Sequence, residues 1–435
     1  MHNQLCIIES GGHEKFGPLT HFRPVFDLRC GILTLREKLQ AYYGEVDVSL
    51  HCRPHLQELE RRRAPGLPVN EWPSGPALLV DGRLVADPEL PRQIPLEGPP
   101  DVVFTSEGEP VGARLSQAML ERVRRAPSGL ALLDLAELLP AEPVSVHLVR
   151  WPWDLVAQNA RAITRDFWKL VSREPGDFHH GTVDPGATLL HAECIRIGSG
   201  SHVQSGAVLD GRGGPIYLGR DVTVMPGVVV EGPVAIGDGA VLKIHAKIYS
   251  STTIGPVCKV GGEVEGSIIH GYSNKQHDGF LGHSYIGEWC NLGAGTNNSD
   301  LKNNYSNVRV KIAGESVDTG HMFVGLTMGD HSKSGIGTNF NTGTVVGSGC
   351  NIFGGGYPPK AIPSFSWGGA DGLVTYDVEK CIAVARTVTG RRGVEFGPIE
   401  EAAMRAIFER TADERRQAGV NDATPAAPSL HPASV

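Results

Sequence analysis

The chain has 435 residues and a formal net charge of −8, and these two properties exclude several classes of protein. A nucleic-acid binder is not expected, because no sequence-wide positive field exists to displace counterions from phosphates. A membrane protein is not expected either, because no stretch approaches ~18 consecutive apolar residues and no signal-like segment opens the chain. The sequence therefore predicts a cytoplasmic protein of two or three domains, at ~150 residues each.

Glycine and cysteine usage narrow the fold class further. Glycine accounts for 55 residues while aromatic residues make up only 6%, a balance typical of folds that turn tightly and often. The eight cysteines stand singly, without a Cys-x-x-Cys pair. We therefore expect them as buried apolar side chains in a reducing compartment and not as a metal clamp.

Residues 1–175 predict an α/β domain. Short apolar runs typical of strands alternate with helical patterns, and Pro-rich connectors separate them. The domain closes with a stretch whose period and charge suit a helix that links it to the next domain. The expected strands are 5–8, 77–80 and 102–104, and the expected helices are 33–43, 113–125 and 153–171.

Residues 180–370 predict an all-β domain, a left-handed parallel β-helix. An aliphatic-Gly pair recurs at Leu218, Ile236 and Ile254, each 18 residues apart. Eighteen residues make three hexapeptides, the length of one triangular coil, in which one aliphatic residue per side points inward and a small residue turns the corner. A β-sandwich with glycine turns is the alternative, but its turns come every ~8–12 residues.

The end of the chain and two internal segments depart from this repeat. The polar segments 268–285 and 296–322 are expected as loops that leave the β-helix, where chemistry usually takes place. Residues 371–420 are expected to form an extension with a short amphipathic helix over 398–418. Residues 421–435, rich in Ala and Pro, predict a disordered tail.

His277 is the first candidate for chemistry, because it lies in a polar segment just before a Leu-Gly corner. An imidazole of near-neutral pKa can take the proton from an attacking amine or hydroxyl, and backbone N–H groups at glycine-rich turns can hold a thioester oxyanion. Two other interpretations stay open. In the first, His277 is a surface histidine without a role. In the second, His270, His277 and His283 bind a zinc ion, as three histidines do in trimeric β-helix carbonic anhydrases.

Two runs of this region carry a family resemblance: His277-Asp-Gly-Phe-Leu-Gly-His283 and Asn291-Leu-Gly-Ala-Gly-Thr296. They resemble the acetyltransferase half of the bifunctional N-acetylglucosamine-1-phosphate uridyltransferase / glucosamine-1-phosphate acetyltransferase family. That motif reads His-x-x-Tyr-Leu-Gly-Asp and then Asn-Ile-Gly-Ala-Gly-Thr. The resemblance implies that His277 is the catalytic base and that Asn291 helps to hold the sugar and the acyl donor. It also implies that a turn covers the pantetheine arm of acetyl-CoA, and its residues are Gly293, Ala294 and Gly295.

The sequence departs from the family pattern at three positions. Phe280 replaces the tyrosine, His283 replaces the aspartate, and Asp300 stands where an asparagine is expected. These changes leave acyl transfer as the expected chemistry and leave the acceptor open.

Four further polar residues are candidates for binding the sugar and acyl-CoA. Asn274 and Lys275 directly precede the run that contains His277. By the resemblance, Lys302 takes the place of a basic sugar-phosphate contact, and Lys333 is a partner for CoA phosphates as a point charge. The alternative for Lys333 is a solvated surface lysine.

The N-terminal domain carries a second, partial resemblance, to the nucleotide loop of sugar-phosphate nucleotidyltransferases. The matching residues after the first expected strand are Gly11, Gly12, Lys15, Thr20 and Arg23. The resemblance implies that backbone N–H groups of the glycine turn approach a nucleoside triphosphate, while basic residues offset charge as pyrophosphate leaves. The usual arginine of the loop is absent.

Two aspartates complete this resemblance. Asp81 follows an apolar strand, as the metal-binding Asp of the family does, and Asp154 lies in a segment similar to the later Asp-containing motif. The resemblance implies that the two carboxylates bind Mg²⁺, a hard cation that prefers oxygen ligands.

The two resemblances together cover residues 1–370 and imply a homotrimeric, bifunctional enzyme of sugar-nucleotide synthesis. Its N-terminal domain would join a sugar 1-phosphate to a nucleoside triphosphate, and its β-helix would transfer an acetyl group from acetyl-CoA to an amino sugar phosphate. Two alternatives stay open: an acyltransferase whose N-terminal domain is a degenerate sugar-phosphate binder, or a non-catalytic trimeric scaffold.

Overall fold

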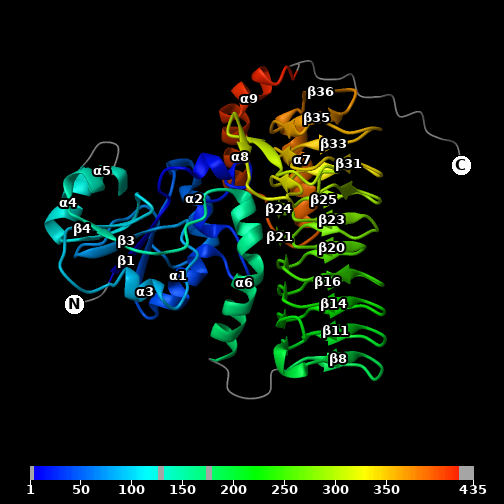
Figure 1. The fold of residues 1–435 in the computed structure, drawn as a ribbon. Helices are drawn as coiled ribbons and strands as arrows, with labels where there is room; N and C mark the ends of the chain where they lie inside the picture. Colours follow the sequence, from blue (N-terminus) through cyan, green and yellow to red (C-terminus); the bar gives the residue numbers. More distant parts are fainter. Residues whose placement is uncertain (1–3, 126–131, 173–178, 421–435) are drawn as a thin grey trace, which may run out of the picture.

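The computed structural model describes residues 4–125, 132–172 and 179–420. An α/β domain lies beside a tall β-helix, with one long helix between them, and a group of short helices covers the upper end of the β-helix (Figure 1). This architecture confirms the predicted fold class. The predicted tail, 421–435, lies outside the described residues.

The α/β domain is built on a sheet with strand order β2-β1-β3-β5-β4-β6. Strand β1 pairs in parallel with β2 and β3, whereas β5 is antiparallel to β3 and β4. The carboxyl ends of β1 and β3 therefore lie side by side, the edge at which open α/β sheets bind ligands. The strands are β1 (Gln4–Ile8), β2 (Asp47–His51), β3 (Ala77–Asp81), β4 (Val102–Ser106), β5 (Glu109–Leu115) and β6 (Ala141–Pro143).

The helices of this domain agree with the sequence in part. Thr34 and Glu37 form a capping box at the start of the first helix, which fixes where it begins. The predicted helix over 113–125 is wrong in its first residues, because 109–115 form β5, whose two buried faces hide the alternation of a strand. The helices are α1 (Leu35–Tyr43), α2 (Gln57–Arg63), α3 (Leu90–Gln93), α4 (Gln117–Arg125) and α5 (Leu132–Leu138).

The predicted linking helix is confirmed as α6 (Pro152–Val171). It runs along the β-helix and contacts strands of one of its faces (Figure 1). Asn159 is fully buried in this contact: it accepts from Gly31 N–H at 2.7 Å and donates to Ser251 O at 2.7 Å. The helix thus joins the α/β domain and the β-helix into one packed body.

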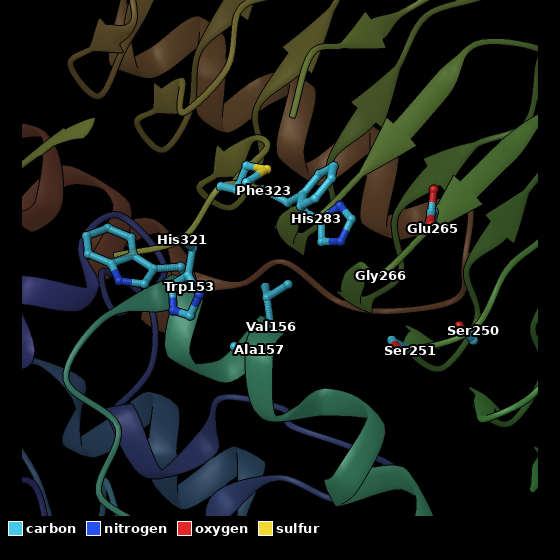
Figure 2. A pocket seen from close by; sticks show the side chains of 11 residues that line it. Trp153, Val156, Ala157, Ser250, Ser251, Glu265, Gly266, His283, His321 and Phe323 are labelled. Atoms are coloured by element: carbon cyan, nitrogen blue, oxygen red, sulfur yellow. The ribbon is translucent and has the colours of Figure 1, made fainter. Parts of the chain in front are cut away.

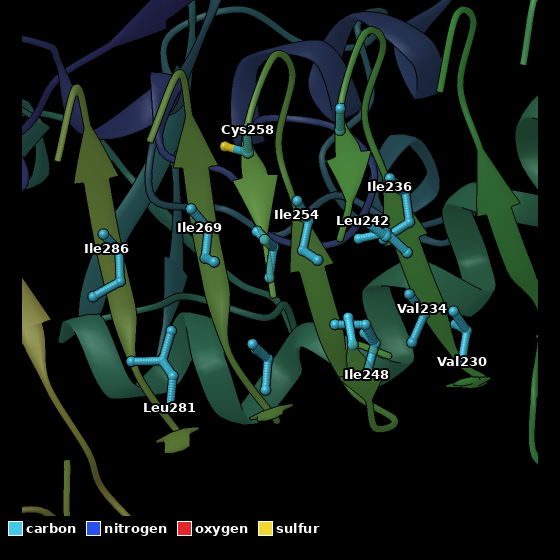
Figure 3. Packing of buried hydrophobic residues seen from close by; sticks show 14 of the residues in the cluster. Val230, Val234, Ile236, Leu242, Ile248, Ile254, Cys258, Ile269, Leu281 and Ile286 are labelled. Carbon is cyan, nitrogen blue, oxygen red and sulfur yellow. The ribbon is translucent and has the colours of Figure 1, made fainter. Parts of the chain in front are cut away.

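Stacked coils in the described part of the chain form the long parallel sheets of the β-helix. The sheets run from β7 (Thr182–Val183) to β35 (Ser366–Gly369), from β8 (Thr188–Leu190) to β23 (Phe280–Gly282), and from β9 (Ile195–Ile197) to β34 (Ala361–Ile362). The predicted 18-residue period appears in the register, where Ile236 pairs with Ile254. Aliphatic side chains point inward from every face and form one buried core (Figure 3).

One predicted loop is wrong and the other is confirmed. Segment 268–285 is a regular coil made of β21 (Ile268–Gly271), β22 (Asn274–Lys275) and β23, because Ile269 and Leu281 keep their inward positions between polar neighbours. The insertion between 296 and 322 does leave the coil. It carries a hairpin of β27 (Arg309–Ile312) and β28 (Glu315–Asp318).

The C-terminal extension is more helical than predicted. Strand β36 (Gly372–Thr375) turns back on β35, and α7 (Val378–Gly390), α8 (Pro398–Arg410) and α9 (Ala412–Gln417) follow. The predicted amphipathic helix corresponds to α8 and α9, whereas α7 was missed. Cys381 and Ile382 of α7 pack with Phe365 of the last coil and with Phe22 of the α/β domain, so the extension bridges the two domains. Within the described residues, no helix is both long and apolar enough to cross a bilayer.

Candidate functional site

The glycine turn of the α/β domain lies at the predicted edge of the sheet. Gly12 lies four residues beyond the end of β1 and adopts a left-handed φ of 93°. A Cβ at this position would lie 3.2 Å from Arg83 Nη1, so only glycine fits there without displacing the guanidinium. The turn thus sits against the residues that follow β3.

Asp81, the last residue of β3, is fully buried and fully engaged. Its carboxylate accepts from Ser10 Oγ, from Arg83 N–H at 2.8 Å and from Arg83 Nη2 at 2.8 Å. Arg83 also approaches Glu109, which pairs with Arg150 Nε at 2.7 Å. A network of alternating charge therefore extends from Asp81 away from the glycine turn.

Asp154 is the third residue of α6, and its carboxylate accepts backbone N–H groups at the start of the helix. Its Oδ2 accepts from Arg150 N–H at 2.7 Å and from Trp151 N–H at 3.0 Å, and burial raises its pKa. The two predicted Mg²⁺ ligands are thus a carboxylate paired with arginine and a helix cap. In this arrangement the two carboxylates do not fit a magnesium site.

The other predicted nucleotide-loop residues separate into two groups. Lys15 is exposed and lies 5.3 Å from the centroid of the Trp151 ring, close to the glycine turn. Thr20 is buried and donates to His13 O at 3.0 Å. Arg23 points away from the turn and into the β-helix.

Arg23 is the centre of the contact between the domains. Its fully buried guanidinium donates to Asp330 Oδ1 at 3.1 Å and to Glu288 Oε2 at 2.8 Å, and His270 lies beside the same glutamate. A nucleotide cannot reach this guanidinium without displacing the β-helix. The structure therefore places Arg23 in the domain interface and not in a nucleotide site.

The predicted acyltransferase residues of the β-helix are brought together in part. Asn274, Asn291 and Lys333 stand on adjacent strands, because Asn274 pairs with Asn291 and Asn291 with Lys333. Both ends of this row are held by the protein: Arg392, just beyond α7, donates to Asn274 Oδ1 at 2.7 Å, and Lys333 Nζ donates to His331 O at 2.9 Å. Burial lowers the pKa of Lys333.

His277 lies at an exposed corner of the same coil, between β22 and β23. Within the described residues, its imidazole makes no hydrogen bond. The predicted Gly-Ala-Gly turn stacks on it from the next coil, where Gly295 N–H donates to Asp278 O at 3.0 Å. The histidine and the turn are thus neighbours, as the resemblance implies.

Two of the residues predicted to bind the sugar or CoA, Lys275 and Lys302, point away from the row of Asn274, Asn291 and Lys333. Lys275 faces the interior of the β-helix, donates to Gly261 O at 2.9 Å and to His277 O at 3.1 Å, and burial lowers its pKa to about 8. Lys302 lies in the insertion and donates to Ser306 Oγ at 3.1 Å within its own loop. Neither ammonium group faces the row of Asn274, Asn291 and Lys333.

The zinc alternative is wrong. In the described ranges, no group of three or more His, Cys, Asp or Glu side chains is arranged to hold a metal ion. His270 is buried in the domain interface, His277 lies at an exposed corner, and His283 lies at a different corner of the coil.

Sequence reasoning missed a pocket of about 290 Å³ between α6 and this last corner. Figure 2 shows His283 and Phe323 facing His321 and Trp153 across it. His283 Nδ1 lies 2.8 Å from Asp300 Oδ2, and its ring stacks on Phe323 with centroids 5.1 Å apart. His283 and Asp300 are two of the three positions at which the sequence departs from the family pattern. Their joint departure could have predicted that the two side chains form a pair.

The chain is similar to several known proteins. Residues 5–174 match the family model described as sugar nucleotidyl transferase. The bifunctional protein GlmU of Methanococcus aeolicus is 32% identical over 173 residues, which are 35% of this chain and 38% of that protein. GlmU of Methanocaldococcus jannaschii is 32% identical over 143 residues, 33% of this chain and 30% of that protein. The chain thus spans about a third of the length of these relatives, and the predicted relationship is confirmed.

Solved structures were also compared. The UDP-N-acetylglucosamine acyltransferase of Francisella novicida shares 12% identity over 55% of this chain and 78% of that chain, with a TM-score of 0.31.

Proposed function

We propose that this protein is a cytoplasmic, bifunctional transferase of sugar-nucleotide synthesis. The α/β domain would transfer a nucleotidyl group from a nucleoside triphosphate to a sugar 1-phosphate, and the β-helix would transfer the acetyl group of acetyl-CoA to an amino sugar phosphate. The observation that carries the proposal is the sugar nucleotidyl transferase match over residues 5–174, in a domain whose glycine turn lies at the ligand-binding edge of its sheet. The relatives described as bifunctional support the second activity.

In the nucleotidyl step, a phosphate oxygen of the sugar 1-phosphate attacks the α-phosphorus of the triphosphate, and pyrophosphate leaves. Backbone N–H groups of Gly11 and Gly12 are suited to hold phosphate oxygens. Lys15, exposed beside the turn, would offset the negative charge of the departing pyrophosphate.

In the acyl step, His277 accepts a proton from the amino sugar as its nitrogen attacks the thioester carbon. The carbon–sulfur bond then breaks, and the CoA thiolate leaves with a proton. Backbone N–H groups at Gly293 and Gly295, with the Asn291 amide, would steady the oxyanion of the tetrahedral intermediate. The stacking of this turn on the His277 corner supports these roles.

A homotrimer would complete this second site. His277 and Asn291 are both exposed, so the protomer alone does not enclose an acyl donor. The β-helix presents flat, rigid faces that suit packing around a three-fold axis. Sedimentation equilibrium at micromolar concentration is expected to give three times the chain mass, and a monomer would count against this assembly.

The nucleotidyl activity is tested by pyrophosphate release from UTP or dTTP with a panel of sugar 1-phosphates and Mg²⁺. The variant Asp81→Asn is expected to abolish release, because it loosens Arg83 beside the glycine turn. Asp47→Asn, at an exposed aspartate on β2, is the matched control and is expected to keep full activity.

The acyl activity is tested by thiol release from acetyl-CoA in the presence of glucosamine 1-phosphate. Loss of a general base is expected to lower kcat by ~10²–10⁴ in His277→Asn. The matched control is His245→Asn, an exposed histidine at the same corner two coils earlier. Equal activity of His277→Asn and wild type, with both proteins of the same mass, would rule out His277 as the base.

A second candidate function is favoured by the pairing of Asp81 with Arg83. An aspartate neutralised by its own arginine suits a domain that binds a sugar phosphate without transferring a nucleotide. Thiol release without pyrophosphate release would select this acyltransferase, and silence in both assays would select the trimeric scaffold.

A further inference from the structure

A cavity of about 710 Å³ lies where three parts of the molecule meet. Its walls come from the α/β domain, from the upper coils and the hairpin tip, and from the C-terminal helices, which lie against the upper coils in Figure 1. The proposed catalytic residues Gly11, Asp81 and His277 do not line it. The wall segments are 13–21, 53–55, 311–314, 345–364 and 407–418.

Two of the cations at this cavity have no counter-ion among the residues that the structure describes. Arg410, the last residue of α8, and Lys311, on the hairpin, are both exposed, and no described carboxylate lies within 4 Å of either charge. Arg53 also lines the cavity, but its Nε forms a salt bridge with Glu9 Oε2 at 2.9 Å. Cationic groups of this kind bind phosphate oxygens through charge-assisted hydrogen bonds.

The pKa values of two histidines that line the cavity, His21 and His55, reflect the positive charge around it. Burial, together with the positive charges of Arg53 and Arg410, lowers the pKa of His21 to about 3 and that of His55 to about 4. His21 Nδ1 lies 3.1 Å from Ser348 Oγ, which leaves Nε2 for a ligand.

Two carboxylates, Glu14 and Glu414, also line the cavity. Glu14 lies 3.3 Å from His13 Nε2. Burial raises the pKa of Glu414. Because Arg410 and Lys311 lack a counter-ion among the described residues, an anionic ligand suits these walls.

We propose that this cavity binds a phosphorylated small molecule, with its phosphate held by Arg410, His21 and His55. The volume lies within the ~300–1,000 Å³ of small-molecule sites, so a sugar or nucleoside has room beside the phosphate. The ligand contacts the α/β domain, the β-helix and the C-terminal helices at once. Its binding therefore stabilises the joined arrangement of all three. The cavity adjoins the proposed nucleotide loop through His13, Glu14 and Thr20, but Gly11, Gly12 and His277 do not line it, so the ligand need not be a substrate of either proposed reaction.

The test is histidine footprinting of the full-length protein with diethyl pyrocarbonate, with inorganic pyrophosphate as the probe. Pyrophosphate is expected to slow modification of His55, read by mass spectrometry, and to leave His245 on the lower β-helix unchanged. Unchanged modification of His55 at millimolar pyrophosphate would overturn the proposal.

Variants then locate the phosphate. Arg410→Gln is expected to weaken the protection of His55 by roughly ten-fold in probe concentration, the size of one charge-assisted hydrogen bond. Arg405→Gln, on the same helix but paired with Glu379, is the matched control and is expected to behave as wild type. Equal weakening in both variants would mean non-specific attraction and would overturn the site.

The same footprint identifies the source of the phosphate. Protection by glucosamine 1-phosphate at lower concentration than pyrophosphate indicates a sugar phosphate, and protection by uridine 5′-diphosphate indicates a nucleotide. Because Asp81→Asn leaves the cavity intact, protection must persist in that variant. Loss of protection there would place the probe at the nucleotidyl site and overturn the proposal, whatever the outcome of the turnover assays.

Discussion

The lower half of the β-helix, up to Val260, and the upper half, from Ile268 onward, follow the same repeat. They differ in their inward side chains and in how much of their outer surface is covered. Along one sheet, the inward positions of the lower half are all aliphatic, whereas those of the upper half alternate between aliphatic and polar. The lower residues are Val203, Val224, Leu242 and Val260, and the upper residues are Lys275, Leu292, Ser334 and Ile352. The core of the upper half therefore contains polar side chains, Lys275 and Ser334, at positions where the lower half has aliphatic ones.

The outer surface differs in the same sense. Lower-half residues such as Arg220 and Lys247 point to solvent, while His270, Asp330 and His331 of the upper half are buried beneath other parts of the chain. The α/β domain and the C-terminal helices supply that cover. The comparison teaches that the repeat, with the contact of α6 along one face, accounts for the lower half, whereas contacts with the α/β domain and the C-terminal helices bury polar groups in the upper half.

The largest expected effect is at the domain contact. Asp330→Ala removes the main partner of the fully buried Arg23 and is expected to lower the free energy of unfolding by about 3–5 kcal/mol, because a buried charge is left uncompensated. Urea unfolding followed by circular dichroism measures the loss.

The double variant Arg23→Met/Asp330→Leu is the control for this prediction. It removes both fully buried charges and is expected to be more stable than Asp330→Ala, since Glu288, which also loses Arg23, is partly exposed to solvent. A loss below about 1 kcal/mol in Asp330→Ala would show that the halves do not differ in their dependence on the α/β domain.

The next effect concerns the polar interior of the upper half. Burial lowers the pKa of Lys275 from 10.5 to about 8, so between these values the unfolded chain binds more protons than the folded one. Stability therefore rises with pH through this window, and below pH 8 the full cost is present. The difference between Lys275→Met and wild type is expected to shrink by about 3 kcal/mol between pH 8 and pH 10.5.

Measured unfolding free energies at pH 7.5, 9 and 10.5 test this, with Val260→Met, the lower neighbour in register, as the control. The control has no titrating group at that position, so its difference from wild type is expected to stay constant. A constant difference for Lys275→Met as well would mean that its ammonium group is hydrated.

Much of the fold was predictable from the sequence because the repeat is a local property. Aliphatic-Gly pairs at fixed spacing gave the β-helix, and the period of 153–171 gave α6. Segment 268–285 was misread because polar Asn274, Lys275 and Gln276 obscure the inward Ile269 and Leu281. Helix α7 was missed because its buried side chains are recognisable only from their contacts. Cys381 and Ile382 pack against the last coil and the α/β domain.

The candidate site was predictable only where it follows a linear motif. The runs around His277 and Asn291 gave neighbours in space, because adjacent coils place them together. The partners of Arg23 and Asp81 were not predictable in this way. Arg23 meets Asp330 across 307 residues, and the pairing of Asp81 with Arg83 depends on how the glycine turn packs.

The smallest expected effect tests whether the two halves share one coil. A buried corner serine recurs in both, and each hydroxyl donates to a carbonyl of the next coil and accepts from an N–H there. Ser201→Ala in the lower half and Ser332→Ala in the upper half are each expected to cost about 2 kcal/mol, because a buried carbonyl and N–H lose their partner. Equal losses, read from thermal unfolding, are expected because each hydroxyl makes the same two hydrogen bonds to the next coil. Losses that differ by more than about 1 kcal/mol would mean that contacts between domains also alter the coil itself. The partners are Gly219 O at 2.7 Å and Val222 N at 2.9 Å for Ser201, and Gly347 O at 2.6 Å and Cys350 N at 3.0 Å for Ser332.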